Sequence, residues 1–373
     1  MLSRNAPFFH LCECLQGKLP ARKIDWMSVI ELANNSLTTP VLKDFANQFS
    51  KEVPADVQAY LTEIHGRNRV RNERLAKQLV EAIAALNSVN ITPTLIKGAA
   101  MLVSTDALKT GNRIMADLDI LVAPEQIKSA LNCLSQLGYS VSTGDPVDPR
   151  IHFVTVQRPD DVGQIDLHRR LPGPNFFYST LGPIHAHCKI FMYKNVSTNL
   201  LSPTYHALIL ICHDQFQDGD YRAAKIDLRH FLDLRELINS PEGVDWELLD
   251  SLPKDNFVRN GIETYLVTLH ELLDVEVPLR FRKHFVPRFQ YWRRSQNINM
   301  PKLRFILSLT ALMLDCPGYL KHRKQTFLGR INDLPRQPDQ IGRSVRKAPT
   351  WGGLKWMLHH QYFDKEQIAG KIG

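Results

Sequence analysis

The sequence contains no stretch that could cross a membrane and no recognisable secretion signal. Its longest apolar run, Phe305 to Leu314, is far shorter than the roughly 18 residues that a membrane-spanning helix needs. The N-terminus lacks the order of charged, apolar and small residues that marks a signal peptide. We therefore expect a soluble, cytoplasmic protein without a transmembrane segment.

Cysteine is scarce and scattered, which argues against a zinc-binding fold. The chain of 373 residues has six cysteines, and only Cys12 and Cys14 are neighbours in sequence. One intervening residue is too few for the usual zinc pair, and no second pair accompanies them. We expect reduced thiols, as is usual in the cytoplasm. With 44% hydrophobic and 23% charged residues and no repeat, the composition is that of a folded protein of two or three domains.

The stretch from Thr94 to Val122 carries the clearest chemical pattern. A short apolar run ends at Lys97 and Gly98, and a helix-forming segment follows directly. Glycine lets the backbone approach a phosphate closely, and a helix N-terminus offers free N–H groups at the positive end of its dipole. The junction therefore predicts a phosphate-binding cradle formed by Gly98, Ala99 and Ala100.

Asp117 and Asp119 lie in an apolar segment that predicts a strand. Alternate residues of a strand share a face, so both carboxylates project together while Leu118 and Ile120 point into the core. Neighbouring carboxylates repel unless a cation neutralises them. Because Mg²⁺ prefers oxygen ligands and usually binds carboxylates together with substrate phosphates, we expect Mg²⁺ or Mn²⁺ at this pair.

These residues resemble the uncharacterised bacterial branch of the polymerase-beta-type nucleotidyltransferase superfamily. In that superfamily a glycine opens a helix after an apolar run, Asp-x-Asp follows on a strand, and a third carboxylate lies on a later strand. The residues that carry the resemblance are Lys97, Gly98, Arg113, Asp117, Asp119 and Asp166. The resemblance covers roughly residues 85–240. It has one departure, because Ala99 and Ala100 stand where a serine often touches a phosphate.

The resemblance implies a mixed α/β fold, with a nucleotidyltransferase core built on a small mixed sheet and flanked by N-terminal and C-terminal helical regions. It implies transfer of a nucleoside monophosphate from a nucleoside triphosphate to an acceptor hydroxyl, with release of pyrophosphate. Asp117, Asp119 and Asp166 would be the catalytic metal ligands, and Asp166 would also take the hydroxyl proton. Lys97 and Arg113 would neutralise nucleotide charge. The nucleotide and the acceptor stay open.

Four regions are expected along the chain. They are an N-terminal helical region (1–88), the nucleotidyltransferase core (89–195), a helical lid or acceptor domain (196–275) and a basic C-terminal region (276–373). Within the core, alternating segments around residues 158–161 predict a hairpin whose second arm sets Asp166 beside Asp117 and Asp119. From residue 174 onward the chain is expected to be helical.

For two pairs of residues on those later helices we favour a structural role over a functional one. His206 and His213 are seven apart and so share a helical face, which fits a metal site or, as we favour, structural histidines. Asp227 and Asp233 are expected to be exposed or paired with arginines of their own helix.

The last quarter of the chain is strongly basic. Between Arg280 and Lys347 there are sixteen Lys or Arg and three acidic residues, whereas the whole chain has a net charge of +8. Interleaved aromatic side chains suit binding of RNA. They suit an anionic membrane surface equally well, and a solvated basic face is the third alternative.

Three other functions compete with nucleotidyl transfer. A metal-dependent glycosyltransferase also uses Asp-x-Asp, although it needs neither Lys97–Gly98 nor a third strand aspartate. A degenerate transferase that only senses nucleotides or binds a partner would explain Ala99 and Ala100, but it would not need all three carboxylates. Modification of tRNA by a toxin or phage-defence module is a special case of the first function.

Overall fold

The computed structural model describes residues 7–104, 109–144, 152–173, 184–253, 255–299 and 307. All of these belong to one compact unit. The helices of the N-terminal part are α1 (Pro7–Leu15), α2 (Trp26–Asn35), the 3-10 turn η1 (Thr39–Val41), α3 (Leu42–Gln48) and α4 (Ala55–Ser88). This arrangement agrees with the helical N-terminal region expected from the sequence.

A seven-stranded mixed sheet follows, in the order β3-β4-β5-β2-β1-β7-β6. Its strands are β1 (Thr94–Leu95), β2 (Asp117–Leu121), β3 (Ser140–Thr143), β4 (Phe153–Gln157), β5 (Gln164–His168), β6 (Cys188–Tyr193) and β7 (Val196–Leu201). Between strands lie α5 (Lys97–Ser104), the 3-10 turn η3 (Pro124–Gln126) and α6 (Ile127–Gln136), and the 3-10 turn η4 (Ile184–His187) precedes β6. Strand β2 pairs in parallel with β5 and antiparallel with β1, so the expected mixed α/β fold is confirmed.

Helices dominate after the sheet. They are α8 (Pro203–Cys212), the π-helical turn η5 (His213–Gln217), α9 (Asp220–Ala223), α10 (Leu228–Ile238), α11 (Trp246–Ser251), α12 (Asn256–Leu273), the 3-10 turn η6 (Leu279–Phe281) and α13 (Phe285–Asn299). Helix α8 is buried from Thr204 to Cys212, on all of its faces, because it packs against α10, α11 and α12. None of the helices among the described residues combines the length and hydropathy that a membrane-spanning helix requires.

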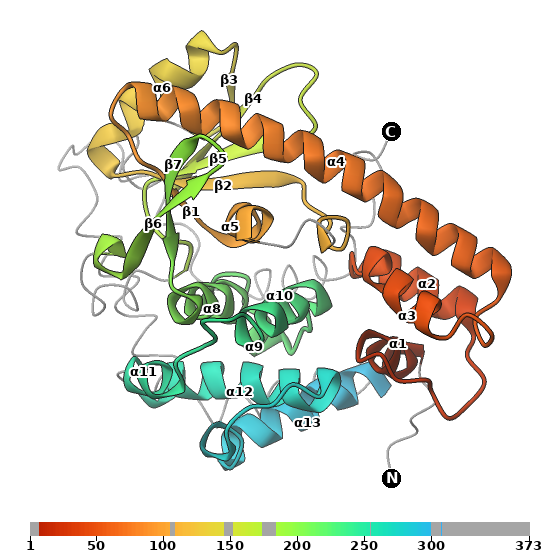
Figure 1. Ribbon diagram of the computed structural model, residues 1–373. Helices are drawn as coiled ribbons and strands as arrows, with labels where there is room; N and C mark the ends of the chain where they lie inside the picture. Colours follow the sequence, from red (N-terminus) through yellow and green to blue (C-terminus); the bar gives the residue numbers. More distant parts are fainter. Residues whose placement is uncertain are drawn as a thin grey trace, which may run out of the picture. The chain divides into compact units, whose positions relative to one another are not determined.

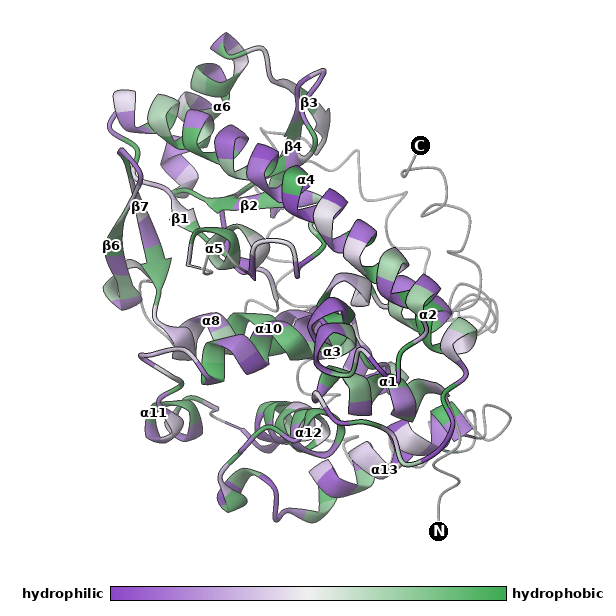
Figure 2. Ribbon diagram, turned by 45° about the vertical axis from the view of Figure 1, so that its right-hand side comes forward, coloured by the Kyte–Doolittle hydropathy of each residue, from purple (hydrophilic) through white to green (hydrophobic). Residues whose placement is uncertain are grey.

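The 34-residue helix α4 connects two hydrophobic cores. Near its start, Val57 and Leu61 belong to a core shared with the flanking helices. Near its end, Leu75, Leu79 and Ile83 belong to the core of the sheet. Figure 1 shows α4 as the long orange helix, and Figure 2 shows hydrophilic and hydrophobic residues alternating along it, as expected of a helix with one buried face.

One prediction about this region was wrong. The chain was expected to be helical after residue 174, but β6 and β7 form an antiparallel hairpin and β7 pairs with β1 inside the sheet. The expected boundary between the core and the helical region, at residue 195, falls in the turn of this hairpin. The division of the chain into four regions otherwise stays a prediction.

Candidate active site at the centre of the sheet

The predicted neighbourhood of three carboxylates is present on β2 and β5. These strands are parallel, and their register sets Asp119 directly opposite Asp166 and Asp117 opposite Gln164. Leu118 and Ile120 are fully buried on the other face, as the alternation of a strand requires. The predicted adjacency of Asp166 and the Asp117–Asp119 strand is thus confirmed.

Of the three carboxylates, Asp119 accepts the most hydrogen bonds from described side chains. It is 2% exposed, and its Oδ1 lies 2.9 Å from Lys97 Nζ and 2.8 Å from His168 Nε2. Burial alone would raise the pKa of Asp119, but the hydrogen bonds and charges of His168 and Lys97 hold it well below its usual range. No described residue donates a hydrogen bond to Oδ2, which leaves that oxygen for another ligand.

The surroundings of Asp166 shift its pKa in the opposite direction, upward. Burial raises the pKa of Asp166, and the negative charges of Asp119 and Asp117 raise it further, although a hydrogen bond from Thr155 lowers it. Thr155 Oγ1 donates to Asp166 Oδ1 at 2.7 Å. Ligand atoms of Asp119, Asp166 and His168 all lie within 4.8 Å of one another. The crowding of negative charge and the oxygen donors fit a hard divalent cation.

The junction of β1 and α5 brings backbone close to this group. The Ile96 N–H donates to the carbonyl of Asp119 at 3.3 Å. Lys97 then has a φ of +47°, a left-handed conformation that costs free energy in a residue other than glycine. The Ala100 N–H makes a long hydrogen bond of 3.4 Å to the carbonyl of Ile96. Gly98 and Ala99 therefore offer the backbone donors best placed for an anion.

Arg113 has a structural partner that the sequence did not reveal. Its Nε donates to both carboxylate oxygens of Asp233 on α10, at 2.9 and 3.0 Å. Asp233 was expected to be exposed or paired within its own helix, and that expectation was wrong because it is 4% exposed. A Cβ added at Gly98 would lie only 2.5 Å from Arg113 Nη1, so this guanidinium also lies against the start of α5.

A family model described as "Uncharacterised nucleotidyltransferase" matches residues 22–274. This chain belongs to that nucleotidyltransferase family. The matched segment begins before α2, includes the whole sheet and ends just after α12. The resemblance noted in the sequence is therefore confirmed, and it extends over more of the chain than the motifs alone indicated.

Other comparisons add little about function. No curated protein matches the chain. Among solved structures, an antigenic nucleotidyltransferase-like protein from Paracoccidioides brasiliensis is 17% identical, with a TM-score of 0.34, over 53% of this chain and 92% of that chain. Similarity at this level carries no argument about the reaction.

Helix α4 supports the site of this nucleotidyltransferase-family protein from outside. Asn68 Nδ2 donates to the carbonyls of Gly111 and Arg113, at 2.7 and 2.9 Å. Asn72 Nδ2 donates to the carbonyls of Thr110 and Arg113, at 2.6 and 2.8 Å. Both side chains are buried, so α4 fixes the loop that leads into β2.

Sequence reasoning missed Asn68, Asn72, Thr155 and His168 as parts of the site. For His168 a signal existed, because it lies two residues after Asp166 and therefore on the same strand face. For the two asparagines the signal was weaker. They occupy one face of a charged helix, and only the fold brings them to the loop.

The basic C-terminal segment lies mostly outside the described residues, which include Arg280 to Asn299 and Leu307. Within the described part, Arg293 and Arg294 are each 1% exposed. Arg293 donates to the carbonyls of Tyr221 and Arg222, and Arg294 donates to Gln215 Oε1 and Thr268 Oγ1. These two arginines are structural, and binding of RNA or membrane by 280–347 stays a prediction.

Proposed function

We propose that this protein is a metal-dependent nucleotidyltransferase that transfers a nucleoside monophosphate from a nucleoside triphosphate to an acceptor hydroxyl. The observation that carries the proposal is the register of β2 and β5, which sets Asp119 opposite Asp166 with Asp117 two residues away. Membership of a nucleotidyltransferase family supports the same reaction class.

Asp117, Asp119 and Asp166 would hold the divalent cation, Mg²⁺ or Mn²⁺. When bound, such an ion neutralises phosphate charge and lowers the pKa of a coordinated hydroxyl. The donor set fits, because hard cations take carboxylate oxygens and Asp119 Oδ2 has no donor among the described residues. The charges that raise the pKa of Asp166 are the charges that a cation would balance.

The start of α5 would bind the β- and γ-phosphates. Gly98 and Ala99 present N–H groups at the positive end of a helix, with Ala100 as a weaker donor because of its bond to Ile96. Lys97 contributes a point charge, and its Nζ is already 2.9 Å from Asp119. Arg113 is anchored through Nε by Asp233, which holds its Nη1 against Gly98.

Asp166 is the residue proposed to accept the proton. Its Oδ1 accepts from Thr155, so the carboxylate is oriented while Oδ2 remains for the acceptor hydroxyl. As the proton moves to Asp166, the hydroxyl oxygen bonds to the α-phosphorus and the bond to pyrophosphate breaks on the opposite side. Lys97, Arg113 and the α5 N–H groups stabilise the charge that develops on the leaving pyrophosphate.

Transfer can be tested without knowing the acceptor. The protein is incubated with each α-labelled nucleoside triphosphate, Mg²⁺ and a fractionated cell lysate, and label is sought in every fraction. We expect one nucleotide to label one fraction, and label to be lost in Asp119→Asn and Asp166→Asn. Asp160→Asn, in the exposed turn before β5, is the matched control and should keep activity. Absence of label with all four nucleotides would refute the proposal.

A further inference from the structure

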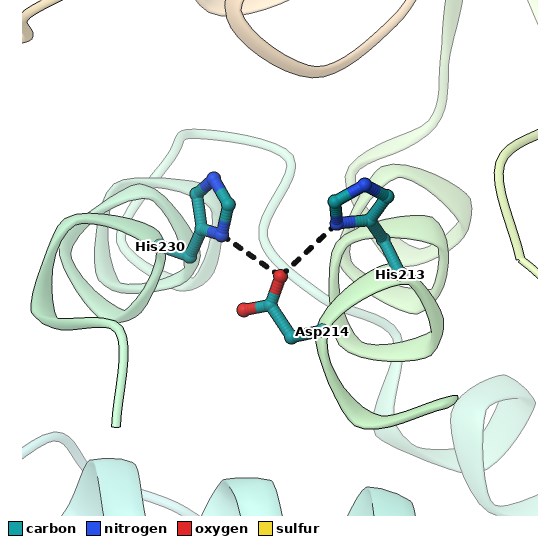
Figure 3. A group of neighbouring side chains, drawn as sticks. All are labelled: His213, Asp214 and His230. Atoms are coloured by element: carbon teal, nitrogen blue, oxygen red, sulfur yellow. Dashed lines mark hydrogen bonds and ion pairs between the residues drawn. The ribbon is translucent and has the colours of Figure 1, made fainter. Parts of the chain in front are cut away.

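A second cluster of titratable side chains lies among the helices that follow the sheet. His213 and Asp214 begin the π-helical turn η5, and His230 lies on α10. Nδ1 of His230 is 2.8 Å from Asp214 Oδ1, and Nδ1 of His213 is 3.3 Å from the same oxygen. Figure 3 shows the two rings, from separate helices, pointing at this one carboxylate.

The 3.3 Å distance is close to an edge of a tetrahedral metal site, whereas the 2.8 Å distance is that of a hydrogen bond. Ligands at about 2.1 Å from zinc are separated by roughly 3.4 Å in a tetrahedron. Two further carboxylates lie at this spacing, since Asp218 Oδ2 is 3.5 Å from His213 Nδ1 and Asp227 Oδ2 is 3.5 Å from His230 Nδ1. The nitrogen and oxygen atoms are therefore arranged as three ligands with two candidates for a fourth.

The cluster is built rigidly around Asp214. This carboxylate is 1% exposed, and its second oxygen, Oδ2, accepts a hydrogen bond of 2.9 Å from the hydroxyl of Tyr265 on α12. Such an outer contact orients a ligating carboxylate. The π-helical geometry from His213 to Gln217 is itself uncommon, and turns of this type occur frequently at functional sites.

A cleft of about 580 Å³ is lined by residues adjacent in sequence to the cluster. Asp218 and Asp227 line this cleft, together with Asp220, Lys225 and Arg229. The candidate fourth ligands therefore belong to its wall, so an ion could enter from that side.

We propose that Nδ1 of His213, Nδ1 of His230 and Oδ1 of Asp214 bind a divalent transition metal of the zinc class. Imidazole with one carboxylate is a donor set that such ions prefer, whereas Mg²⁺ prefers oxygen alone. The site lies on helical elements outside the sheet and does not depend on nucleotidyl transfer.

Binding requires one rearrangement. Arg229 Nη2 lies 3.2 Å from His230 Nε2, and arginine only donates, so without metal Nε2 accepts and the Nδ1 proton points to Asp214. Metal binding at Nδ1 requires the other neutral tautomer, in which the single ring proton has moved from Nδ1 to Nε2 and faces Arg229. Arg229 must then turn into the cleft, which it already lines. Arg229→Gln, whose amide oxygen can accept from Nε2, should bind metal more tightly.

The test is a zinc titration of the full chain, stripped of metal, against a chromophoric chelator in excess Mg²⁺. Wild type should bind zinc at this site. In His213→Gln and His230→Gln the affinity for zinc should fall by at least about a hundredfold, because even residues that only orient a ligand are worth 10–100-fold in metal affinity. His284→Gln is the matched control, because His284 Nδ1 contacts the carboxylate of Glu263 at 2.6 Å and belongs to no group of three candidate ligands among the described residues. It should bind zinc like wild type.

One further variant and a check of folding make the outcome decisive. Asp119→Asn should keep the tight zinc site, which separates it from the cation site on the sheet. Melting curves check that each variant folds. His213→Gln should disturb folding less than His230→Gln, because the side chain of His213 is 15% exposed and that of His230 is 9% exposed. Equal affinity in wild type and His213→Gln would overturn the proposal. So would weaker binding by Arg229→Gln, or failure of folded wild type to bind zinc.

Discussion

Arg113 and Asp233 form a buried ion pair that joins the loop before β2 to helix α10. The two side chains are 17% and 5% exposed, and the guanidinium Nε is shared between both carboxylate oxygens. A second ion pair, Lys109 with Glu236, joins the same loop and the same helix, at 2.7 Å, but is 52% and 40% exposed. The two pairs therefore differ mainly in their access to water.

Removing one partner should be far more costly in the buried pair. Asp233→Asn leaves the buried guanidinium of Arg113 without its hydrogen-bonded carboxylate partner, which should lower the free energy of unfolding by about 3–5 kcal/mol. Glu236→Gln should lower it by no more than about 1 kcal/mol. Urea unfolding of both variants measures the difference. Equal losses in the two variants would mean that Arg113 does not depend on Asp233.

A side chain at position 98 should destabilise the protein, because Arg113 is held against Gly98. A Cβ there would lie 2.5 Å from Arg113 Nη1 and 3.1 Å from Met115 Cε, so Gly98→Ala should cost about 1–3 kcal/mol of stability. Gly66, inside α4, has open space around it, since a Cβ added there would meet nothing within 4 Å. Gly66→Ala should therefore stabilise the protein by about 1 kcal/mol, through helix propensity. Denaturant midpoints of the two variants should move in opposite directions.

Nucleotide binding should stabilise the fold only when a divalent cation is present. A ligand at a hundredfold excess over its Kd contributes about 2.7 kcal/mol, enough to raise the melting temperature by a couple of degrees. In Asp117→Asn with Asp119→Asn any remaining shift should no longer depend on Mg²⁺, whereas Asp160→Asn should respond as wild type does. Lys97→Ala should weaken the shift only partly. A shift with UDP-sugars alone would instead favour a glycosyltransferase.

The buried carboxyl of Asp220 should make stability depend on pH. Burial and the charge of Asp214 raise the pKa of Asp220 to about 7, above the value of about 3.9 for an unfolded chain. Between these two values the folded state binds the proton and the unfolded state does not, so this contribution to stability is full below about pH 4 and is lost as pH rises to about 7.

Asp220→Asn removes that titration. In the presence of a chelator, the variant should melt at a higher temperature than wild type at pH 8, and the difference should disappear near pH 4. Asp160→Asn, in an exposed turn, should shift melting equally little at both pH values. A pH-independent difference for Asp220→Asn would contradict the assignment.

The parts of the site that were predictable are those set by local periodicity. Alternation in a strand put Asp117 and Asp119 on one face, and the turn at residues 158–161 implied the hairpin that carries Asp166. The hairpin of β6 and β7 lacked such signals. Its turn uses Lys194, with a φ of +55°, where glycine would have marked it. Its edge strand β6 also leaves Ile190 and Met192 75% and 61% exposed, without the polar alternation of a typical surface strand.

Long-range partners could not be inferred in the same way. Arg113 and Asp233 are 120 residues apart, and His230 reaches Asp214 only because α10 packs beside α8 and η5. The sequence places His206 and His213 on one helical face, where it favours structural histidines over a metal site. In the structure His206 lies instead near Arg113 and Asp233, where burial lowers the pKa of His206 to about 4, and His213 turns towards α10.

Helix α4 has a consequence for how the protein unfolds. Because Leu61 packs in the helical core and Leu79 in the core of the sheet, one continuous ladder of backbone hydrogen bonds serves both. Neither core can melt without exposing half of that ladder to water, so the two should lose structure in a single cooperative transition. Amide hydrogens in the middle of α4 should accordingly exchange as slowly as those of β2, and only at the rate of global opening.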